Sequence, residues 1–362
     1  MRTKVIKSDI SNLKLIAVVC FCFVACSSPQ NEYNSRLKPY FGDSESDYYI
    51  ADDVAGHIHK PNAKREFKWD EHPLGKIVQK TNNFGFRENS NTNLKKNIDV
   101  VRVLVTGDSH TDGVLYNTES FPNLMEKMFN EKIETRQTFD FINAAAGYYG
   151  PQNYFGVLKR FANLKPNMFI VTIYTGNDFL DAIRIEAENG RLNVPERKDD
   201  YYYDLWEVDE KHRGFTGQLM NQIKFFKTFP EYKRKSISLC EDYLTHIKNT
   251  CYKKGIKLYV VLLPTKLDIE AELDKERIEE VKKILKFSDE DLNINQLLTT
   301  QLVNTLKKHN ITCFNLNDFW KEKSMEELYW RNDYHINHNG HKRIADYLMS
   351  RITLESKFYN KE

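Results

Sequence analysis

The chain has 362 residues, of which 41% are hydrophobic and 29% charged, and its 53 basic and 51 acidic residues leave a formal net charge of +2. This composition is that of a globular protein large enough for one or two domains. It excludes a collagen-like or disordered chain. The near-neutral charge also lacks the basic surplus of a nucleic-acid-binding domain, so no nucleic acid is expected as a partner.

The first 25 residues have the pattern of a secretory signal peptide. Lys4, Lys7 and Lys14 precede an apolar run of about eleven residues from 15 to 25. That run is too short to span a bilayer as a stable helix, and small residues stand at its end. We therefore predict a signal peptide over residues 1–25.

The end of this run resembles a bacterial lipobox, in which a cysteine after a small residue receives lipid and becomes the new N-terminus. The residues are Phe23-Val24-Ala25-Cys26, with Phe23 where leucine is usual. We expect Cys26 to carry the lipid, so that the exported protein is anchored to a bacterial cell-envelope membrane. A plain signal peptide cut near Ala25 and an uncleaved anchor are the alternatives.

Three further cysteines remain in the mature chain. Cys240 and Cys251 lie on one predicted helix, roughly 16 Å apart along its axis, which is too far for a disulfide. Cys313 lies in the apolar run 311–315 and is expected to be a small core residue. The sequence therefore predicts no disulfide framework, although a cystine between Cys313 and one helix cysteine stays open.

The chain beyond the signal peptide divides into a linker, an extension and a domain. Residues 26–48 are polar and are predicted to be a linker. Residues 49–98 carry turn residues and few long apolar periods, so they are predicted to form an irregular N-terminal extension. From residue 99 to 355 the pattern is that of a domain built from alternating strands and helices.

Continuous apolar runs and helical periodicity alternate within this domain. Buried strands are predicted at 100–106, 139–143, 168–174, 257–263 and 311–315. Helices are predicted at 120–129, 152–161, 232–254, 268–309 and 340–351, with a charged and tyrosine-rich insertion at about 184–230. This alternation predicts a parallel sheet, with an active site outside the carboxyl ends of its strands.

The first motif with chemical meaning is Gly107-Asp108-Ser109-His110-Thr111, which follows directly on the first strand. Ser109 therefore stands where a strand ends and a helix with free N–H groups begins. A nucleophilic serine also needs a base and donors aimed at the developing oxyanion. The alternative is that the serine is a plain helix N-cap.

Three later segments supply those groups. The loop after the second strand contains Gly147 and Gly150, and glycine lets a backbone N–H approach a ligand closely. The third strand is followed by Gly176-Asn177-Asp178, and the asparagine amide is a neutral hydrogen-bond donor. The segment 333–341, which reads DYHINHNGH, supplies a base and a carboxylate just before the last helix.

The order of these motifs resembles the SGNH/GDSL hydrolase superfamily. GDS at 107–109, a glycine loop, GND at 176–178 and H-x-N-x-x-G-H at 335–341 occur in that order. NNFGFR at 82–87 is similar to the lead-in of many bacterial members. The resemblance implies a flavodoxin-like three-layer α/β/α sandwich with a central parallel sheet.

The resemblance also implies roles for individual residues. Ser109 corresponds to the nucleophile and His335 to the base. The oxyanion hole would consist of the Ser109 N–H, the Gly147 N–H and the Asn177 side chain, with Gly150 as the alternative to Gly147. No cofactor belongs to this chemistry.

The carboxylate of the triad departs from the commonest pattern of the family. That pattern has an aspartate three residues before the histidine, where this chain has Asn332. The D-x-H spacing of Asp333 and His335 resembles the alginate O-acetyltransferase-like branch. We assign Asp333 to orient His335, with a dyad plus a backbone carbonyl as the alternative, because triads are defined by geometry rather than by spacing.

Several other residues allow two interpretations each. His335, His338 and His341 are spaced by three, but they do not share one helix, so no metal site is expected. The pair His57 and His59 is expected on an exposed strand or loop. His110 either lines the cleft or faces solvent. Arg87 either ties the extension to the domain or touches an acidic substrate. The aromatic cluster 201–206 either stacks on a sugar or packs the insertion.

These residues together predict a serine ester hydrolase that works through an acyl-enzyme. Its expected substrate is an acylated, most simply acetylated, glycan of the cell envelope, an inference from the expected location by analogy. An O-acyltransferase with the same triad, a lipase or thioesterase, and an inactive glycan-binding lipoprotein are the alternatives. The intact set of Ser109, Asn177, Asp333 and His335 argues against the last.

Overall fold

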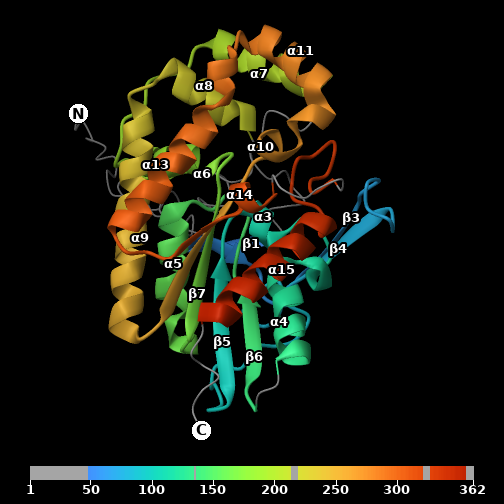
Figure 1. The fold of residues 1–362 in the computed structure, drawn as a ribbon, viewed down its shortest axis with the longest axis vertical. Helices are drawn as coiled ribbons and strands as arrows, with labels where there is room; N and C mark the ends of the chain where they lie inside the picture. Colours follow the sequence, from blue (N-terminus) through green and yellow to red (C-terminus); the bar gives the residue numbers. More distant parts are fainter. Residues whose placement is uncertain (1–47, 134–135, 213–218, 321–326, 356–362) are drawn as a thin grey trace, which may run out of the picture. The chain divides into compact units, whose positions relative to one another are not determined.

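The computed structural model describes residues 48–133, 136–212, 219–320 and 327–355 (Figure 1). The chain divides into two compact units, residues 1–51 and 52–362. In the first unit the described part is 48–51, where strand β1 (Tyr49–Asp52) begins. Cys26, the predicted signal peptide and the predicted linker up to residue 47 lie outside the described residues. Within the described ranges, no helix is both long and apolar enough to cross a membrane.

A five-stranded parallel sheet forms the centre of the second unit. Its strands are β5 (Val100–Thr106), β6 (Thr138–Asn143), β7 (Met168–Tyr174), β8 (Lys257–Leu263) and β9 (Cys313–Asn315). They lie in the order β6-β5-β7-β8-β9, and every neighbouring pair is parallel. All five predicted strands are confirmed, although β9 begins two residues later than predicted.

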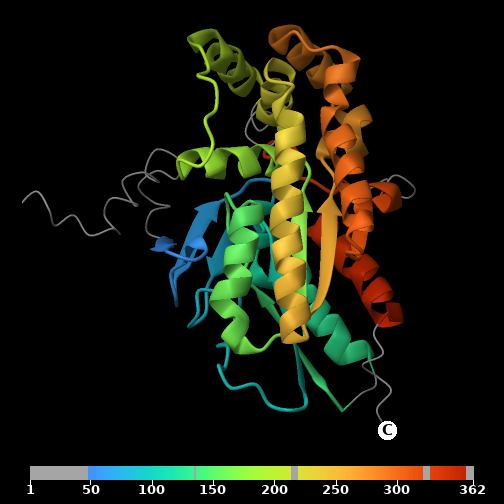
Figure 2. The same ribbon diagram turned by 90° about the vertical axis from the view of Figure 1, so that its left-hand side faces the viewer.

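Helices cover both faces of this sheet (Figures 1 and 2). The side chains of Val103 and Val105 join a core with α4 (Phe121–Lys132) and α15 (His338–Glu355). The opposite face is covered by α5 (Pro151–Phe161) and α9 (Tyr232–Lys254), with α6 (Asp178–Glu188) against α9. The flavodoxin-like three-layer sandwich is thereby confirmed, because the strand order is the one typical of that fold.

The remaining helices connect the strands or lie beyond their carboxyl ends. The segment predicted as an insertion contains α7 (Asp199–Lys211) and α8 (Asn221–Thr228), which lie beyond those ends together with α11 (Lys275–Leu285) (Figures 1 and 2). The shorter and connecting helices are α3 (Ser109–Asp112), η1 (Asn117–Glu119), η2 (Ala162–Leu164), α10 (Lys266–Glu270), η4 (Ala271–Asp274), α12 (Asp289–Leu292), α13 (Ile294–Lys308) and α14 (Leu316–Trp320).

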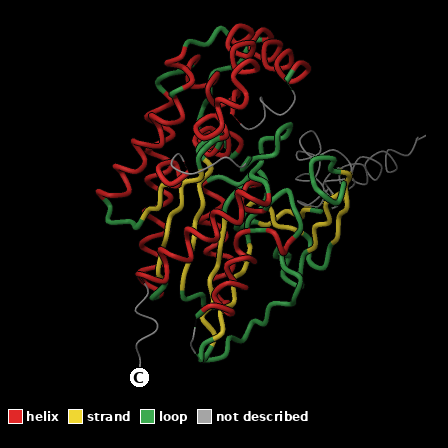
Figure 3. The backbone as a smooth tube through the Cα atoms, turned by 45° about the vertical axis from the view of Figure 1, so that its right-hand side comes forward, coloured by secondary structure: helices red, strands yellow, loops and turns green. Residues whose placement is uncertain are grey.

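The N-terminal extension is more regular than predicted. It contains β2 (Gly56–His59), β3 (Lys64–Lys68) and β4 (Lys76–Lys80), and the last two pair as an antiparallel hairpin (Figure 3). His57 and His59 lie on β2, but they are buried, with 4% and 2% of their surface exposed. The expectation that they lie on an exposed strand or loop is therefore wrong on exposure, because their partners come from distant parts of the chain.

The three cysteines of the sheet and its helices behave as small apolar residues. Cys240 and Cys251 are buried on α9, Cys313 is partly buried in β9, and all three are free. The cystine that the sequence left open therefore does not form among them. Burial raises the pKa of the Cys251 and Cys313 thiols to about 12, so both stay protonated at neutral pH.

Candidate active site

The sheet places Ser109 at the point where its strand order reverses. β5 lies between β6 and β7, and the carboxyl ends of such neighbouring strands form the usual binding crevice of this fold. Ser109 is the first residue of α3, three residues beyond the end of β5, with Gly107 in the turn between them. A Cβ at Gly107 would lie 1.9 Å from the Thr172 hydroxyl oxygen on β7. Only glycine therefore allows the turn to pack so closely on the neighbouring strand.

Asp108, not Ser109, caps the helix that begins there. The Asp108 side chain accepts a hydrogen bond of 2.9 Å from the N–H of His110. The interpretation of Ser109 as a plain N-cap is therefore wrong, since the capping role already belongs to its neighbour. The hydroxyl of Ser109 is left to face another segment of the chain.

That segment is the predicted D-x-H motif. The Nε2 atom of His335 lies 2.8 Å from Ser109 Oγ, although the two residues are 226 positions apart. The Nδ1 atom of the same ring bonds the Asp333 carboxylate. With the Nδ1 proton assigned to that bond, Nε2 is the acceptor for the serine hydroxyl. The structure brings these three predicted residues together, and their chemical roles stay predictions.

The departure from the commonest family spacing has a simple structural reason. Asp333 Oδ1 also accepts the backbone N–H of His335 at 3.2 Å, so the carboxylate folds back onto the residue two positions ahead. Asn332 is exposed, and its own N–H donates to Glu71 at 3.1 Å. The alternative of a dyad plus a backbone carbonyl is not the arrangement found here.

Nearby carboxylates raise the pKa of His335. Burial disfavours the charged ring, but the carboxylate of Asp333, followed by Asp108 and Asp112, outweighs burial and raises the pKa of His335 above its usual 6.5. Burial also raises the pKa of Asp108 to about 7, against the hydrogen bonds that it accepts. An imidazolium formed during a reaction would therefore be stabilised at this position.

The predicted oxyanion donors differ in the hydrogen bonds that they already make. Asn177 follows β7, and its Nδ2 lies 3.3 Å from Asp108 Oδ2. The N–H of Gly150 is already committed, because it donates to Asn153 Oδ1 at 2.9 Å. Within the described part of the chain, by contrast, no group accepts a hydrogen bond from the N–H of Gly147 or of Ser109. This difference favours Gly147 over Gly150 as the donor.

The extension holds the loop that contains Gly147. His57 Nε2 lies 2.8 Å from the Gly147 carbonyl oxygen, and the Tyr149 hydroxyl donates to the His57 carbonyl. Burial lowers the pKa of His57 to about 4, so the ring is neutral at pH 7. Its Nε2–H is then the donor to Gly147. Sequence reasoning missed this contact, since the two residues are 90 positions apart.

The extension also holds the helix of Ser109 through a buried ion pair. Arg87 is completely buried, and its guanidinium lies 2.7 Å from Asp112 Oδ1 and 3.0 Å from Asn117 Oδ1. His59 Nε2 lies 3.3 Å from the other oxygen of Asp112. This burial decides the question left open for Arg87: it ties the extension to the domain and has no surface for an acidic substrate.

Other predicted residues have packing roles. His110 is completely buried and stacks on Tyr174 with ring centroids 3.5 Å apart, so the solvent-facing alternative is wrong. His341 accepts the N–H of Phe121, and burial lowers its pKa to about 3. In the described ranges no group of three or more His, Cys, Asp or Glu residues could hold a metal ion.

The aromatic cluster of α7 divides into a buried and an exposed part. Tyr201 is buried and its hydroxyl donates to Asn221 Oδ1 at 2.9 Å, which fits the interpretation as packing of the insertion. Tyr202, Tyr203 and Trp206 are exposed.

Comparison with known proteins supports the resemblance seen in the motifs. Residues 227–362 match the family described as the SGNH hydrolase-like domain of acetyltransferase AlgX. That range contains Asp333 and His335, whereas Ser109 precedes it. The family model therefore covers the C-terminal part of the predicted domain. A search of curated proteins finds no match to the chain.

Solved structures similar to this chain have low sequence identity to it. An acetyl xylan esterase, AlAXEase, is 15% identical, with a TM-score of 0.40 over 70% of this chain and 100% of that chain. A catalytic mutant of Axe2, an acetylxylan esterase from Geobacillus stearothermophilus, is 11% identical. Its TM-score is 0.41 over 72% of this chain and 97% of that chain. The lipase/acylhydrolase from Enterococcus faecalis is 12% identical. Its TM-score is 0.36 over 72% of this chain and 99% of that chain.

Proposed function

We propose that Ser109 is the nucleophile of this protein. The premise is that the chain is an SGNH-type enzyme acting on ester bonds. His335 is the general base and Asp333 orients it. The proposal is supported above all by the continuous hydrogen-bonded arrangement from Asp333 through His335 to the Ser109 hydroxyl. A serine needs such a base to become reactive.

The reaction follows from this geometry. Nε2 of His335 removes the Ser109 proton while Oγ attacks the ester carbonyl, and the N–H groups of Ser109 and Gly147 with the Asn177 amide stabilise the oxyanion. The alcohol leaves with the proton from His335. Water, deprotonated by the same ring, then attacks the acyl-enzyme and releases the acid, which restores the free serine.

The acyl group that we propose is acetyl, and the alcohol is a hydroxyl of a cell-envelope glycan. The acetyl group is supported by the match to the domain of an acetyltransferase. The same match favours a second candidate, transfer of the acetyl group to an acceptor hydroxyl. Hydrolysis and transfer use identical steps up to the acyl-enzyme and differ only in whether water or a second alcohol attacks it.

The test is hydrolysis of p-nitrophenyl acetate by the full chain beside Ser109→Ala and His335→Ala. Both variants should lose about three orders of magnitude in turnover. Ser350→Ala is the matched control, because that exposed serine donates within α15 and should keep parent activity. A parent that is inert and is not labelled at Ser109 by a fluorophosphonate would overturn the proposal.

The fate of the acetyl group separates the two candidates. With an acetylated glycan as donor and an unacetylated glycan as acceptor, a hydrolase releases one free acetate for each ester lost. A transferase loses the ester without matching acetate and yields an acetylated acceptor. Mass spectrometry of the acceptor and an acetate assay on the same sample decide between them.

Export and anchoring through Cys26 are a separate part of the proposal, supported by the lipobox-like residues before it. Expressed in a bacterium, the mature protein should begin at Cys26 and carry the added mass of acyl chains. Cys26→Ala should abolish both that mass and membrane association. Cleavage at another residue would contradict the anchor without affecting the proposed catalysis.

A further inference from the structure

The residue between Asp333 and His335 has an unusual backbone. Tyr334 has φ 69°, in the left-handed region that favours glycine and disfavours large side chains. Asp333 Oδ1 accepts the N–H of His335, which makes an Asx turn over this position. The contact of the carboxylate with the histidine ring therefore depends on a backbone conformation that a tyrosine adopts only when its surroundings hold it there.

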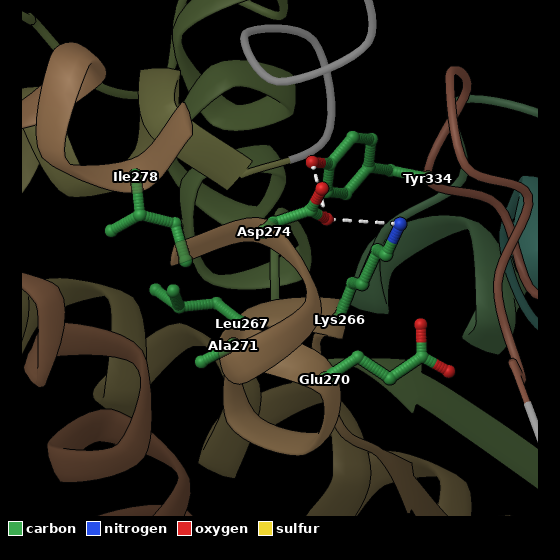
Figure 4. A pocket seen from close by; sticks show the side chains of 7 residues that line it. All are labelled: Lys266, Leu267, Glu270, Ala271, Asp274, Ile278 and Tyr334. Atoms are coloured by element: carbon green, nitrogen blue, oxygen red, sulfur yellow. Dashed lines mark hydrogen bonds and ion pairs between the residues drawn. The ribbon is translucent and has the colours of Figure 1, made fainter. Parts of the chain in front are cut away.

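The Tyr334 side chain points into a buried cluster of charged residues on the segment after β8 (Figure 4). Its hydroxyl donates to Asp274 Oδ2 at 2.9 Å. Lys266 Nζ lies 3.0 Å from the same oxygen and 4.4 Å from the centroid of the tyrosine ring. Arg277 lies 3.3 Å from the other oxygen of Asp274.

Burial makes this cluster rigid. The side chains of Lys266 and Asp274 are only 3% and 4% exposed, so breaking their ion pair would leave an uncompensated buried charge. The space that these side chains line with Glu270 and Ile278 does not admit a water molecule. These side chains therefore pack closely against one another and leave no room for a ligand. We call the cluster of Lys266, Asp274 and Arg277 the anchor of Tyr334.

The residues that hold the Tyr334 side chain lie on short helices that follow a central strand. Lys266 begins α10, three residues after the end of β8, and Asp274 ends η4. The loop of Tyr334 has backbone hydrogen bonds of its own, from Trp330 N–H to the His335 carbonyl and from Tyr334 N–H to the Trp330 carbonyl. These bonds close the loop on itself, whereas the Tyr334 side chain joins it to α10 and η4, which follow β8.

We propose that Tyr334, held by Asp274 and Lys266, is a positioning residue that sets the contact of Asp333 with His335. Its hydroxyl is hydrogen-bonded to Asp274, and it acts through the turn that presents the carboxylate to the ring. This inference rests on the proposed function, since positioning has a kinetic meaning only if His335 serves Ser109.

Two substitutions act on the hydrogen bond between Tyr334 and Asp274 from opposite ends. Tyr334→Phe should lower kcat of p-nitrophenyl acetate hydrolysis by about tenfold with little change in KM, as expected for one hydrogen bond lost from a catalytic arrangement. Asp274→Asn should lower kcat at least as much, because it also removes the buried ion pair with Lys266. Combined in one chain, they should cost hardly more than Asp274→Asn alone, because the Tyr334 hydroxyl has then already lost its charged partner.

The pH profile distinguishes positioning from general destabilisation. His335 faces Asp333 from its own loop, Asp108 and Asp112 from the Ser109 turn and helix, and the His110 ring, whose centroid is 4.8 Å away. A looser Asp333 stabilises the imidazolium less, so the acid limb of kcat/KM should move to lower pH in both variants. Partial unfolding would lower the amplitude of the profile and leave the limb in place.

Tyr334→Gly separates the backbone from the side chain. Glycine relieves the left-handed conformation but removes the anchor, so we expect at least the tenfold loss of Tyr334→Phe. A Gly variant with parent activity would mean that the turn alone sets the geometry. Tyr201→Phe is the matched control, because it removes another buried hydroxyl donor on α7, far along the chain, and should keep parent kinetics.

The outcomes distinguish this inference from the proposed function. Active sites are counted with a fluorophosphonate, so that rates refer to folded, reactive protein. If Tyr334→Phe and Asp274→Asn keep both kcat and the acid limb while Ser109→Ala is inactive, the positioning role is wrong and the serine mechanism stands. If the parent is inert, or Ser109→Ala keeps its activity, the proposed function itself fails.

Discussion

The two segments that meet between Ser109 and His335 are held in different ways. The Ser109 turn, residues 107–113, leaves a central strand, packs its glycine against β7 and is tied by the buried pair of Arg87 and Asp112. The histidine loop, residues 327–337, contains a single bridge between Tyr329 and Ile336 and no longer strand or helix. Its position therefore depends on a few side-chain contacts.

This difference teaches where a substitution should show its effect. The Ser109 turn shares its supports with the core, so damage there should first appear as lost stability. The histidine loop can shift without unfolding the sheet, so damage there should first appear as lost rate. The predictions below, in order of decreasing effect, test that division.

The largest effect is expected in the histidine loop. Asp333→Asn should lower kcat by about 10⁴-fold, because the amide favours the wrong tautomer of His335 and no longer stabilises the imidazolium. The melting temperature should change little, since Asp333 is not in the core. Steady-state kinetics and thermal unfolding of the same preparation measure both.

Asn332→Asp is the control for this prediction. It places a carboxylate at the commonest family position, but the side chain at 332 is exposed and its N–H is bonded to Glu71. The single variant should keep parent kinetics, and Asp333→Asn should not be rescued by it. Recovery in the double variant would show that the loop can choose between two carboxylates.

The next effect is expected in stability. Arg87→Met should lower the free energy of unfolding by about 3–5 kcal/mol, because Asp112 would stay buried without its cation. Chemical denaturation measures the change. Arg160→Met is the control: that arginine is 44% exposed and pairs with Asp52 at 2.8 Å, so at most about 1 kcal/mol should be lost. Equal losses would contradict the role assigned to burial.

The smallest effect is expected at His57. His57→Phe keeps an aromatic ring beside Tyr149 but removes the donor to the Gly147 carbonyl, so kcat should fall by up to about tenfold at pH 8. His246→Phe, an exposed histidine on α9, is the control and should keep parent kinetics. Parent activity in His57→Phe would mean that the Gly147 loop holds its shape without the extension.

The variant His57→Phe should also resist acid unfolding better than the parent. Burial lowers the pKa of His57 to about 4, whereas an unfolded histidine has a value near 6.5. Between these values the unfolded chain binds a proton that the folded chain does not, so stability is lost as the pH falls from 6.5 to 4. Phenylalanine cannot titrate, and the difference in denaturation midpoint between pH 7 and pH 5 should shrink.

Much of the sheet was predictable because its strands are buried on both faces. The run 168–174 is apolar except for Thr172, and all seven residues are buried. The five-residue strand Lys64–Lys68 shows why the extension was not predictable. Its alternating exposed and half-buried residues are mostly charged, and so short a polar strand has no apolar period to detect.

The proximity of the site residues was predictable for a related reason. The carboxyl ends of parallel strands meet at one edge, so motifs that follow different strands are brought together. The supports behind them were not predictable. Lys266 and Asp274 belong to a highly charged segment, which in a sequence indicates a solvated helix, and only the tertiary structure pairs and buries them.

The buried contacts of the extension have a consequence for any shortened version of this enzyme. Truncation at residue 99, where the strand pattern begins, would delete His57, His59 and Arg87 and leave Asp112 and the Gly147 carbonyl facing water-filled gaps. The hydrogen-bond partners upstream of the sheet therefore belong to any fragment that is expected to keep the geometry of the candidate site. A protease that cut this stretch should lower activity without touching Ser109, His335 or Asp333.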